Sequence, residues 1–184
     1  MQRIVRRVDT YSSVLVADPS ITAFGLAVVD FSSDILYTEV IKTEKLAKKL
    51  RIRVGDDDCR RISEINQRIL QAIRNYKVRH IIGELPGGGS QSAVSAKALA
   101  EAKTILQTIA DCLGIGIEWY SEGDSKKCLL GKTSATKQET IDAINKIYKV
   151  NWTGVKYKDE AIADALSIHY TATKKSSVLK LLKI

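Results

Sequence analysis

Proline, histidine and cysteine are scarce in this sequence, and long apolar runs are missing. Two prolines among 184 residues, of which 45% are hydrophobic, exclude a disordered or low-complexity chain. No apolar run approaches the roughly 18–20 residues that span a bilayer, so we do not expect this chain to be a membrane protein. With two histidines, a His/Cys zinc site is not expected. The three cysteines are odd in number and lack C-x-x-C spacing, which favours reduced intracellular thiols over disulfides.

The N-terminal segment lacks the pattern of a secretion signal. Three arginines within residues 3–7 precede a short apolar stretch, but that stretch ends at Asp18 without a small-residue cleavage site. No internal repeat and no Pro- or Gly-rich linker divides the chain. We therefore predict one domain over residues 1–184, with a basic C-terminal tail from about residue 174.

The formal charge of +8 is unevenly placed along the chain. Four segments carry net charges of +3, +5, +4 and +4, namely residues 3–7, 42–53, 126–149 and 174–184, which leaves −8 for the remainder. Any one of these segments could be an ordinary solvated face. Four of them beside an acidic remainder favour a surface that binds a polyanion, most often nucleic acid.

The apolar spacing predicts an α/β fold. Three short runs at 14–17, 24–29 and 35–41 are too close together for crossover helices, so they form an antiparallel meander. Two later strands and four helices are predicted at 80–84 and 115–120, and at 58–76, 91–113, 135–148 and 159–174. Ser90 or Ser92 is placed to cap the 91–113 helix. The result is a mixed five-stranded sheet flanked by helices, which is the architecture of an RNase H-like domain.

Two carboxylates stand at the ends of apolar strands, where an acid is costly. Asp18 follows residues 14–17, and Glu84 follows residues 81–83. Asp18 could equally cap the turn that comes next, whereas no helix begins directly after Glu84. Acids at the ends of adjacent strands would repel each other, and a bound divalent cation with oxygen ligands would remove that repulsion.

Asp164 offers a third carboxylate. The apolar residues between 161 and 168 form one helical face, and Asp164 lies on the rim of that face. Glu160 is one turn earlier on the same side, within i,i+4 reach. An acidic helix start that suits the helix dipole accounts for Asp159, but it does not account for an acid in the second turn.

Four blocks of sequence carry a resemblance to a known family. Residues 18–25, DPSITAFG, are similar to a first-strand motif D-P-G-x-x-x-x-G, and residues 81–84, IIGE, to a central strand that ends in a second acid. Residues 121–140, SEGDSKKCLLGKTSATKQET, are similar to a Lys-rich stretch, and residues 163–166, ADAL, to a last-helix motif. In this order, over about residues 13–172, the blocks resemble the RuvC-type Holliday-junction resolvases of the RNase H-like superfamily.

The resemblance implies metal-binding and catalytic roles for Asp18, Glu84 and Asp164. It also implies contacts to the DNA backbone from lysines of the third block, for which the candidates are Lys126, Lys127, Lys132 and Lys137. The family's fourth acid or histidine, three residues before the last Asp, is Ala161 here, so Glu160 is the predicted substitute ligand.

A second departure from the family's pattern lies after Glu84. An aromatic residue that some members carry there is replaced by the glycines of residues 87–89. Together with Ser90-Gln91-Ser92, this glycine-rich loop is more similar to phage-type members.

The implied activity is that of a Mg²⁺-dependent crossover-junction endodeoxyribonuclease, with Mn²⁺ as a substitute ion. Such an enzyme resolves four-way DNA junctions in recombination, repair or DNA processing. Two ions per site, bridged by Asp18, would activate water and stabilise the leaving 3′-oxygen. Symmetric cleavage requires two sites related by a two-fold axis, so a homodimer is expected. Either the small residues of the 91–113 helix line that interface, or the helix simply packs on the sheet. The implied location is the cytoplasm of a bacterium or of a phage-infected host.

Particular residues argue for or against other functions. An actin-like ATPase needs two copies of this fold, which 184 residues cannot hold. Gly131-Lys132-Thr133 is not a phosphate-binding Walker A loop, because the required earlier glycine is Lys126. A nuclease for other branched DNA or for RNA–DNA hybrids, and a catalytically weak junction-binding protein, remain open alternatives.

Overall fold

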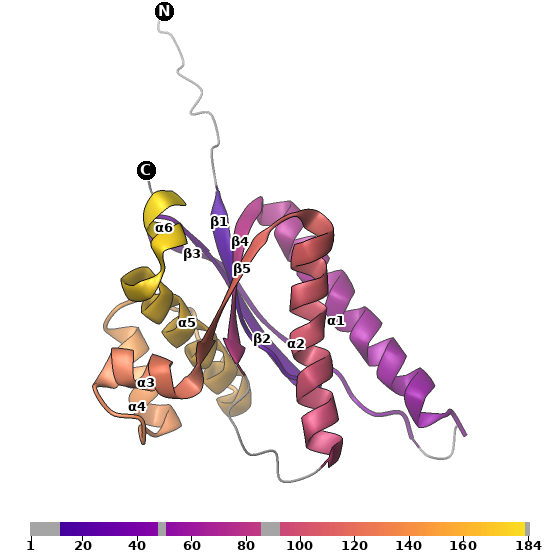
Figure 1. Cartoon of the computed structure of the whole chain (residues 1–184). Helices are drawn as coiled ribbons and strands as arrows, with labels where there is room; N and C mark the ends of the chain where they lie inside the picture. Colours follow the sequence, from indigo (N-terminus) through magenta and orange to yellow (C-terminus); the bar gives the residue numbers. More distant parts are fainter. Residues whose placement is uncertain (1–11, 48–50, 86–92, 183–184) are drawn as a thin grey trace, which may run out of the picture.

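A five-stranded mixed sheet forms the centre of the molecule (Figure 1). The computed structural model describes residues 12–47, 51–85 and 93–182. The strands are β1 (Ser13–Asp18), β2 (Ala23–Asp30), β3 (Ile35–Lys42), β4 (Val78–Leu85) and β5 (Gly116–Ser121), in the order β3-β2-β1-β4-β5. β1, β2 and β3 pair antiparallel, whereas β1, β4 and β5 run parallel. The predicted mixed five-stranded sheet is confirmed.

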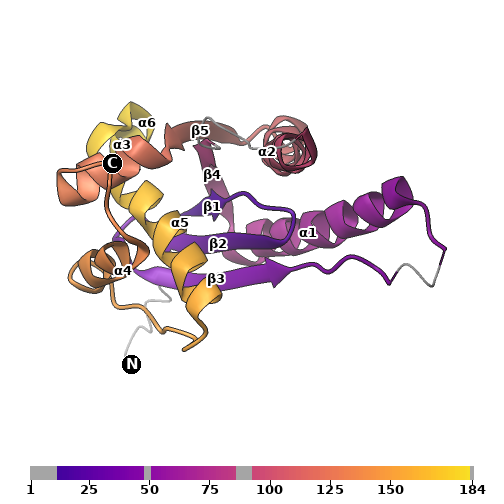
Figure 2. The same ribbon diagram turned by 90° about the horizontal axis from the view of Figure 1, so that it is seen from below.

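Helices cover both faces of the sheet (Figure 2). α1 (Val54–Tyr76) and α2 (Ala93–Leu113) lie on one face. α5 (Lys156–Lys175) packs across the other face and is joined there by α3 (Glu122–Leu130), α4 (Lys137–Asn145) and α6 (Ser177–Leu182). Within the described part of the chain, no helix combines the length and apolar character needed to cross a membrane.

Alternate strand residues feed two separate apolar clusters. On β1, Leu15 and Ala17 pack on the α1–α2 side, whereas Val14 and Val16 pack on the α5 side. On β4, Ile81 and Ile82 divide in the same way. The central strands β1, β2 and β4 are therefore buried on both faces, as expected for a sheet covered by helices on its two sides.

Two helices were not predicted from the sequence. α3 begins where the Ser121 hydroxyl accepts a hydrogen bond from the Asp124 backbone N–H, and it ends at Gly131, whose φ of 73° closes the helix in the left-handed conformation. α6 follows directly after α5, with Leu179 buried. Residues 174–182, predicted to belong to a basic tail, are therefore almost wholly helical.

The predicted single apolar face of the last long helix is wrong. Every residue of α5 from 161 to 169 is buried, because the sheet covers one side while α3 and α4 pack against others. The helix predicted at 135–148 is shorter, since only α4 is helical there. The predicted caps Ser90 and Ser92, the glycines of residues 87–89 and the arginines of residues 3–7 lie outside the described residues.

Candidate active site

Asp18 and Glu84 lie at the same edge of the sheet because β1 and β4 run parallel. The register pairs Ala17 with Gly83, and each acid is the next residue of its strand. Strand alternation turns both acids toward α5, since the residues two positions earlier, Val16 and Ile82, belong to the apolar cluster on that side. The predicted meeting of two strand-end carboxylates thus follows from the register.

Close packing of α5 on the sheet brings the third acid to this edge. Gly25 on β2 pairs with Asp18, and a Cβ at this glycine would lie 2.8 Å from the backbone oxygen of Ala161. Only glycine therefore lets α5 approach so closely beside Asp18. Asp164 is one turn further along α5, and its side chain is 10% exposed.

Burial and neighbouring carboxylates raise the pKa values of all three acids. Burial, and then the charge of Asp164, raise the pKa of Asp18 to about 7. Burial, and then the charges of Asp18 and Asp164, raise the pKa of Glu84 to about 9. Burial also raises the pKa of Asp164, against the lowering effect of Lys137. Neither Asp18 nor Glu84, both of them half-buried, accepts a hydrogen bond from a described residue.

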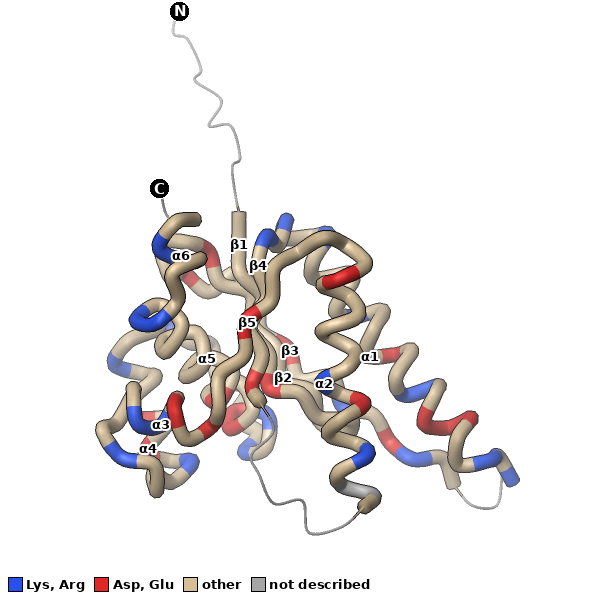
Figure 3. The backbone as a smooth tube through the Cα atoms, in the orientation of Figure 1, with Lys and Arg blue, Asp and Glu red and all other residues tan. Residues whose placement is uncertain are grey.

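Two of the four predicted lysines reach the acids. A capping box between Thr136 and Glu139 begins α4 and makes Lys137 its first residue, whose Nζ lies 2.5 Å from Asp164 Oδ2. Lys126 on α3 lies with its Nζ 2.7 Å from Glu122 Oε1. Lys127 and Lys132 are exposed, and Lys132 pairs with Glu139. Figure 3 shows acidic positions at the lower end of the central strands beside the basic positions of α3 and α4.

Glu122 is an acid of this site that was not singled out from the sequence. It follows β5 directly, and the parallel pairing of Leu85 with Ser121 brings it to the same edge. Its charge contributes to the raised pKa values of Asp18, Glu84 and Asp164. An acid just after a predicted parallel strand was the available signal, but it required the register of β5.

Glu160, the predicted fourth ligand, lies on the wall of a cavity next to the three acids. It lies on α5, one turn before Asp164, and lines a cavity that it shares with Lys137. The charged groups that act on the pKa of Asp18 are Asp164, Lys137 and Glu122. The structure thus brings Asp18, Glu84 and Asp164 together, adds Glu122, and sets Glu160 toward the cavity.

The donor chemistry of the site suits a hard divalent cation. Within residues 12–47, 51–85 and 93–182, no three acidic, histidine or cysteine side chains are set to hold a metal ion as they stand, and Asp164 is paired with Lys137. Asp18 and Glu84 are nevertheless half-buried oxygen donors that accept no hydrogen bond from the described residues and that repel each other. Carboxylate oxygens of this kind are the ligands that Mg²⁺ and Mn²⁺ take.

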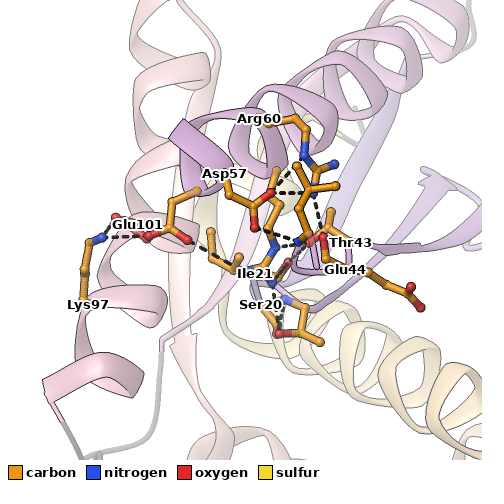
Figure 4. Close-up of polar contacts among 12 residues, drawn as sticks. Ser20, Ile21, Thr43, Glu44, Asp57, Arg60, Lys97 and Glu101 are labelled. Carbon is orange, nitrogen blue, oxygen red and sulfur yellow. Dashed lines mark hydrogen bonds and ion pairs between the residues drawn. The ribbon is translucent and has the colours of Figure 1, made fainter. Parts of the chain in front are cut away.

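A buried arginine anchors the turn that follows Asp18. Arg61 on α1 donates from Nε to Thr43 Oγ1 at 2.8 Å and from Nη2 to the backbone oxygen of Ile21 at 3.2 Å. The backbone N–H of Thr43 bonds to the oxygen of Thr22. Figure 4 shows Ile21 and Thr43 beside the α1 residues Asp57 and Arg60. The position of Asp18 is therefore set by a strand on one side and by an anchored turn on the other.

Comparisons with known proteins give matches in structure alone. No protein-family model matches the chain, and no curated protein matches its sequence. The solved structure of T. thermophilus RuvC in complex with a Holliday junction substrate matches with a TM-score of 0.71 at 22% identity, over 88% of this chain and 93% of that one. A second Thermus thermophilus RuvC structure matches with a TM-score of 0.67 at the same identity and coverage.

A third similar structure comes from a eukaryote. The yeast mitochondrial Holliday junction resolvase Ydc2 matches with a TM-score of 0.63 at 13% identity, over 94% of this chain and 82% of that one. These likenesses extend over most of each chain. They confirm the predicted RNase H-like fold, as it occurs in RuvC.

Proposed function

We propose that this chain is a divalent-metal-dependent endonuclease that resolves four-way DNA junctions. The observation that carries the proposal is the pair of half-buried carboxylates of Asp18 and Glu84, which lie at the ends of two parallel strands beside the buried Asp164 and have raised pKa values. Its support is the shared fold with RuvC, solved on a Holliday junction substrate, and with the yeast resolvase. The basic segments at 42–53 and 126–149 supply the charge that a DNA backbone needs.

Asp18, Glu84 and Asp164 would hold Mg²⁺ or Mn²⁺, up to two ions. Bound there, the metal would supply the activation of water and the stabilisation of the leaving oxygen in phosphodiester hydrolysis. Glu160 remains our predicted fourth ligand, and Glu122 is the alternative that lies with the three acids.

The lysines of the site have two separate tasks in this proposal. Lys137 balances the charge of Asp164, and its own pKa is raised because neighbouring carboxylates outweigh its burial, so it stays protonated. Lys126 balances the charge of Glu122. Lys127 and Lys132, which are both exposed, would contact backbone phosphates without selecting sequence.

Three further features belong to this proposal. Two identical cuts across a symmetric junction need two active sites, so we propose a homodimer. The whole of residues 1–184 would act as one nuclease domain. The protein would work in the cytoplasm, where its DNA substrate lies.

Cleavage of defined DNA substrates tests the proposal. The purified protein is incubated with end-labelled four-way junctions, linear duplexes, single-flap DNA and RNA–DNA hybrids, in Mg²⁺ or in EDTA, with Glu84→Gln as the matched control. We expect paired cuts in the four-way junction, in Mg²⁺ and with the wild-type chain only. Cleavage confined to flap DNA or to RNA–DNA hybrids would show that four-way junctions are not the substrate. Junction binding without any cleavage would overturn the proposed nuclease activity and indicate a junction-binding protein.

A further inference from the structure

A cavity of about 610 Å³ opens beside the acidic site, between the beginnings of α4 and α5. Its volume is within the range of clefts that take small organic groups. Its lining includes Lys137, Gln138, Trp152, Lys156 and Glu160. Apart from Lys137 and Glu160 on its wall, the proposed metal chemistry uses none of the residues that line this space.

The cavity is joined to the site where the phosphodiester bond would be cut. Lys137 lines the cavity and pairs with Asp164, and Glu160 on the cavity wall lies one helical turn from Asp164. A DNA strand whose phosphate lies at Asp18, Glu84 and Asp164 would therefore place the next nucleotide at or near the cavity mouth.

The cavity wall that contains Trp152 is preorganised by hydrogen bonds. The indole Nε1 donates to Asn145 Oδ1 at 2.6 Å, and the ring packs partly against the apolar cluster under α5. Asp159 accepts from the backbone N–H groups of Thr153 at 2.8 Å and Gly154 at 3.1 Å, which fixes the loop after the tryptophan. The ring is thus held in place with its one donor already satisfied, so its remaining interaction with a ligand is stacking.

The polar groups around the ring suit a nucleotide. Lys156 is exposed and makes no ion pair with any described residue, so it is available to a phosphate. Gln138 donates from Nε2 to Asp142 Oδ1 at 2.9 Å, which leaves its Oε1 as an acceptor at the cavity. Aromatic rings beside basic side chains bind unpaired bases with little dependence on sequence.

We propose that this cavity receives one unstacked nucleobase next to the cleaved phosphate, with Trp152 as the stacking surface. The inference rests on the proposed nuclease function and deepens it, since a base can leave its stack most easily at a branch point. Lys156 would hold a phosphate beside that base.

Tryptophan fluorescence tests the stacking without measuring cleavage. The chain has two tryptophans, and Trp119 packs on the opposite face of the sheet, where Lys103 lies over its ring. In Trp119→Phe, Trp152 is the only tryptophan, and we expect a four-way junction in EDTA to quench its emission saturably. In the matched control, Trp152→Phe, the emission of Trp119 should stay unchanged. Equal quenching in both variants, or in neither, would overturn the inference.

Abasic junctions identify the base and keep the test independent of folding. In the wild-type chain, an abasic nucleotide at one position beside the cleaved phosphate should weaken junction binding by about tenfold. The same abasic nucleotide should have no further effect in Trp152→Leu, and Trp152→Phe should restore the sensitivity. Sensitivity to the abasic position that is unchanged in Trp152→Leu would contradict the stacking role.

The two proposals fail in different ways. Cleavage of the junction in Mg²⁺ with a silent Trp152 would overturn the base cavity and leave the nuclease in place. Quenching of Trp152 by the junction without any metal-dependent cleavage would overturn the nuclease and support the cavity as a DNA-binding site.

Discussion

Glu118 faces α5 from the same side of the sheet as Asp18 and Glu84, but its carboxylate oxygens have hydrogen-bond partners and theirs do not among the described residues. Near the middle of β5, the carboxylate of Glu118 accepts hydrogen bonds from His80 Nε2 at 3.1 Å, Tyr120 Oη at 2.7 Å and Ser176 Oγ at 2.7 Å. At the carboxyl ends of β1 and β4, Asp18 and Glu84 accept none from the described residues, and their pKa values are raised.

The difference separates an acid that stabilises the fold from acids that we propose bind a metal ion. Glu118 ties two neighbouring strands to the junction between α5 and α6, because Ser176 caps the start of α6 through Leu179. A carboxylate that is held near other acids without such partners is unfavourable for folding, and groups of this kind cluster where an ion or substrate binds. Burial alone would not have distinguished the two groups.

Matched amide substitutions give the largest expected contrast. Glu84→Gln should lower single-turnover junction cleavage by about 10²–10³-fold or more, because it removes a charge needed in the transition state. Glu118→Gln should leave cleavage nearly unchanged and reduce the free energy of unfolding by about 1–3 kcal/mol, because its hydrogen-bond partners lose a charged acceptor. Cleavage assays and denaturant titrations measure both. Equal loss of cleavage in the two variants would remove the distinction.

The fourth acid gives the next largest effect. If Glu160 is a metal ligand, Glu160→Gln should lower the cleavage rate by about 10–100-fold while junction binding stays intact. Rates are measured across a range of Mg²⁺ concentrations, with Glu122→Gln in parallel. Unchanged cleavage in Glu160→Gln, together with a raised Mg²⁺ requirement in Glu122→Gln, would place the fourth ligand on α3.

Gly25 tests whether the acids depend on the close approach of α5. In Gly25→Ala the new Cβ would press on the Ala161 backbone, so α5 must shift and carry Asp164 with it. We expect about a tenfold loss of cleavage and about 1–3 kcal/mol lost from the free energy of unfolding. Gly55→Ala is the matched control, because nothing lies within 4 Å of the added Cβ. Full activity in Gly25→Ala would show that the spacing of α5 does not set the site.

The smallest effect concerns the metal-free protein and the pH. The folded-state pKa of Glu84, about 9, is above its ordinary value of 4.5, so this group favours the folded state at low pH and that contribution is lost as the pH rises toward 9. Metal-free Glu84→Gln should therefore melt above the wild type at pH 8, by roughly 2–4 °C for each kcal/mol, and show no advantage at pH 4. Melting curves in EDTA at the two pH values measure this. A variant less stable than the wild type at pH 8 would contradict the raised pKa.

Much of the fold follows from local pattern. The three hairpin strands, the two parallel strands and the long helices come from period-2 and helical spacing, which does not depend on distant contacts. α3 was not predicted because it is short and buries only Ser125, so it has no apolar periodicity. Its only sequence signals are Ser121 at the N-cap and Gly131 at the C-cap. α5 was assigned one apolar face because its sequence does not show that α3 and α4 cover its other sides.

The candidate site is divided in the same way. Asp18 and Glu84 could be predicted because each ends an apolar strand, and adjacent parallel strands bring such ends together. The role of Gly25 depends on a contact with Ala161, and that of Glu122 depends on the register of β5. Neither is visible without the tertiary structure, because each requires two distant segments to be placed side by side.

Calorimetric titration of Mn²⁺ into the metal-free chain at pH 8 tests the central claim most directly, with Glu84→Gln as the comparison. We predict saturable binding to the wild type that is lost in the variant, with a heat that varies with the buffer because the raised pKa of Glu84 makes binding release a proton. Binding that is absent from the wild type, or unchanged in Glu84→Gln, would contradict a metal site at this edge of the sheet.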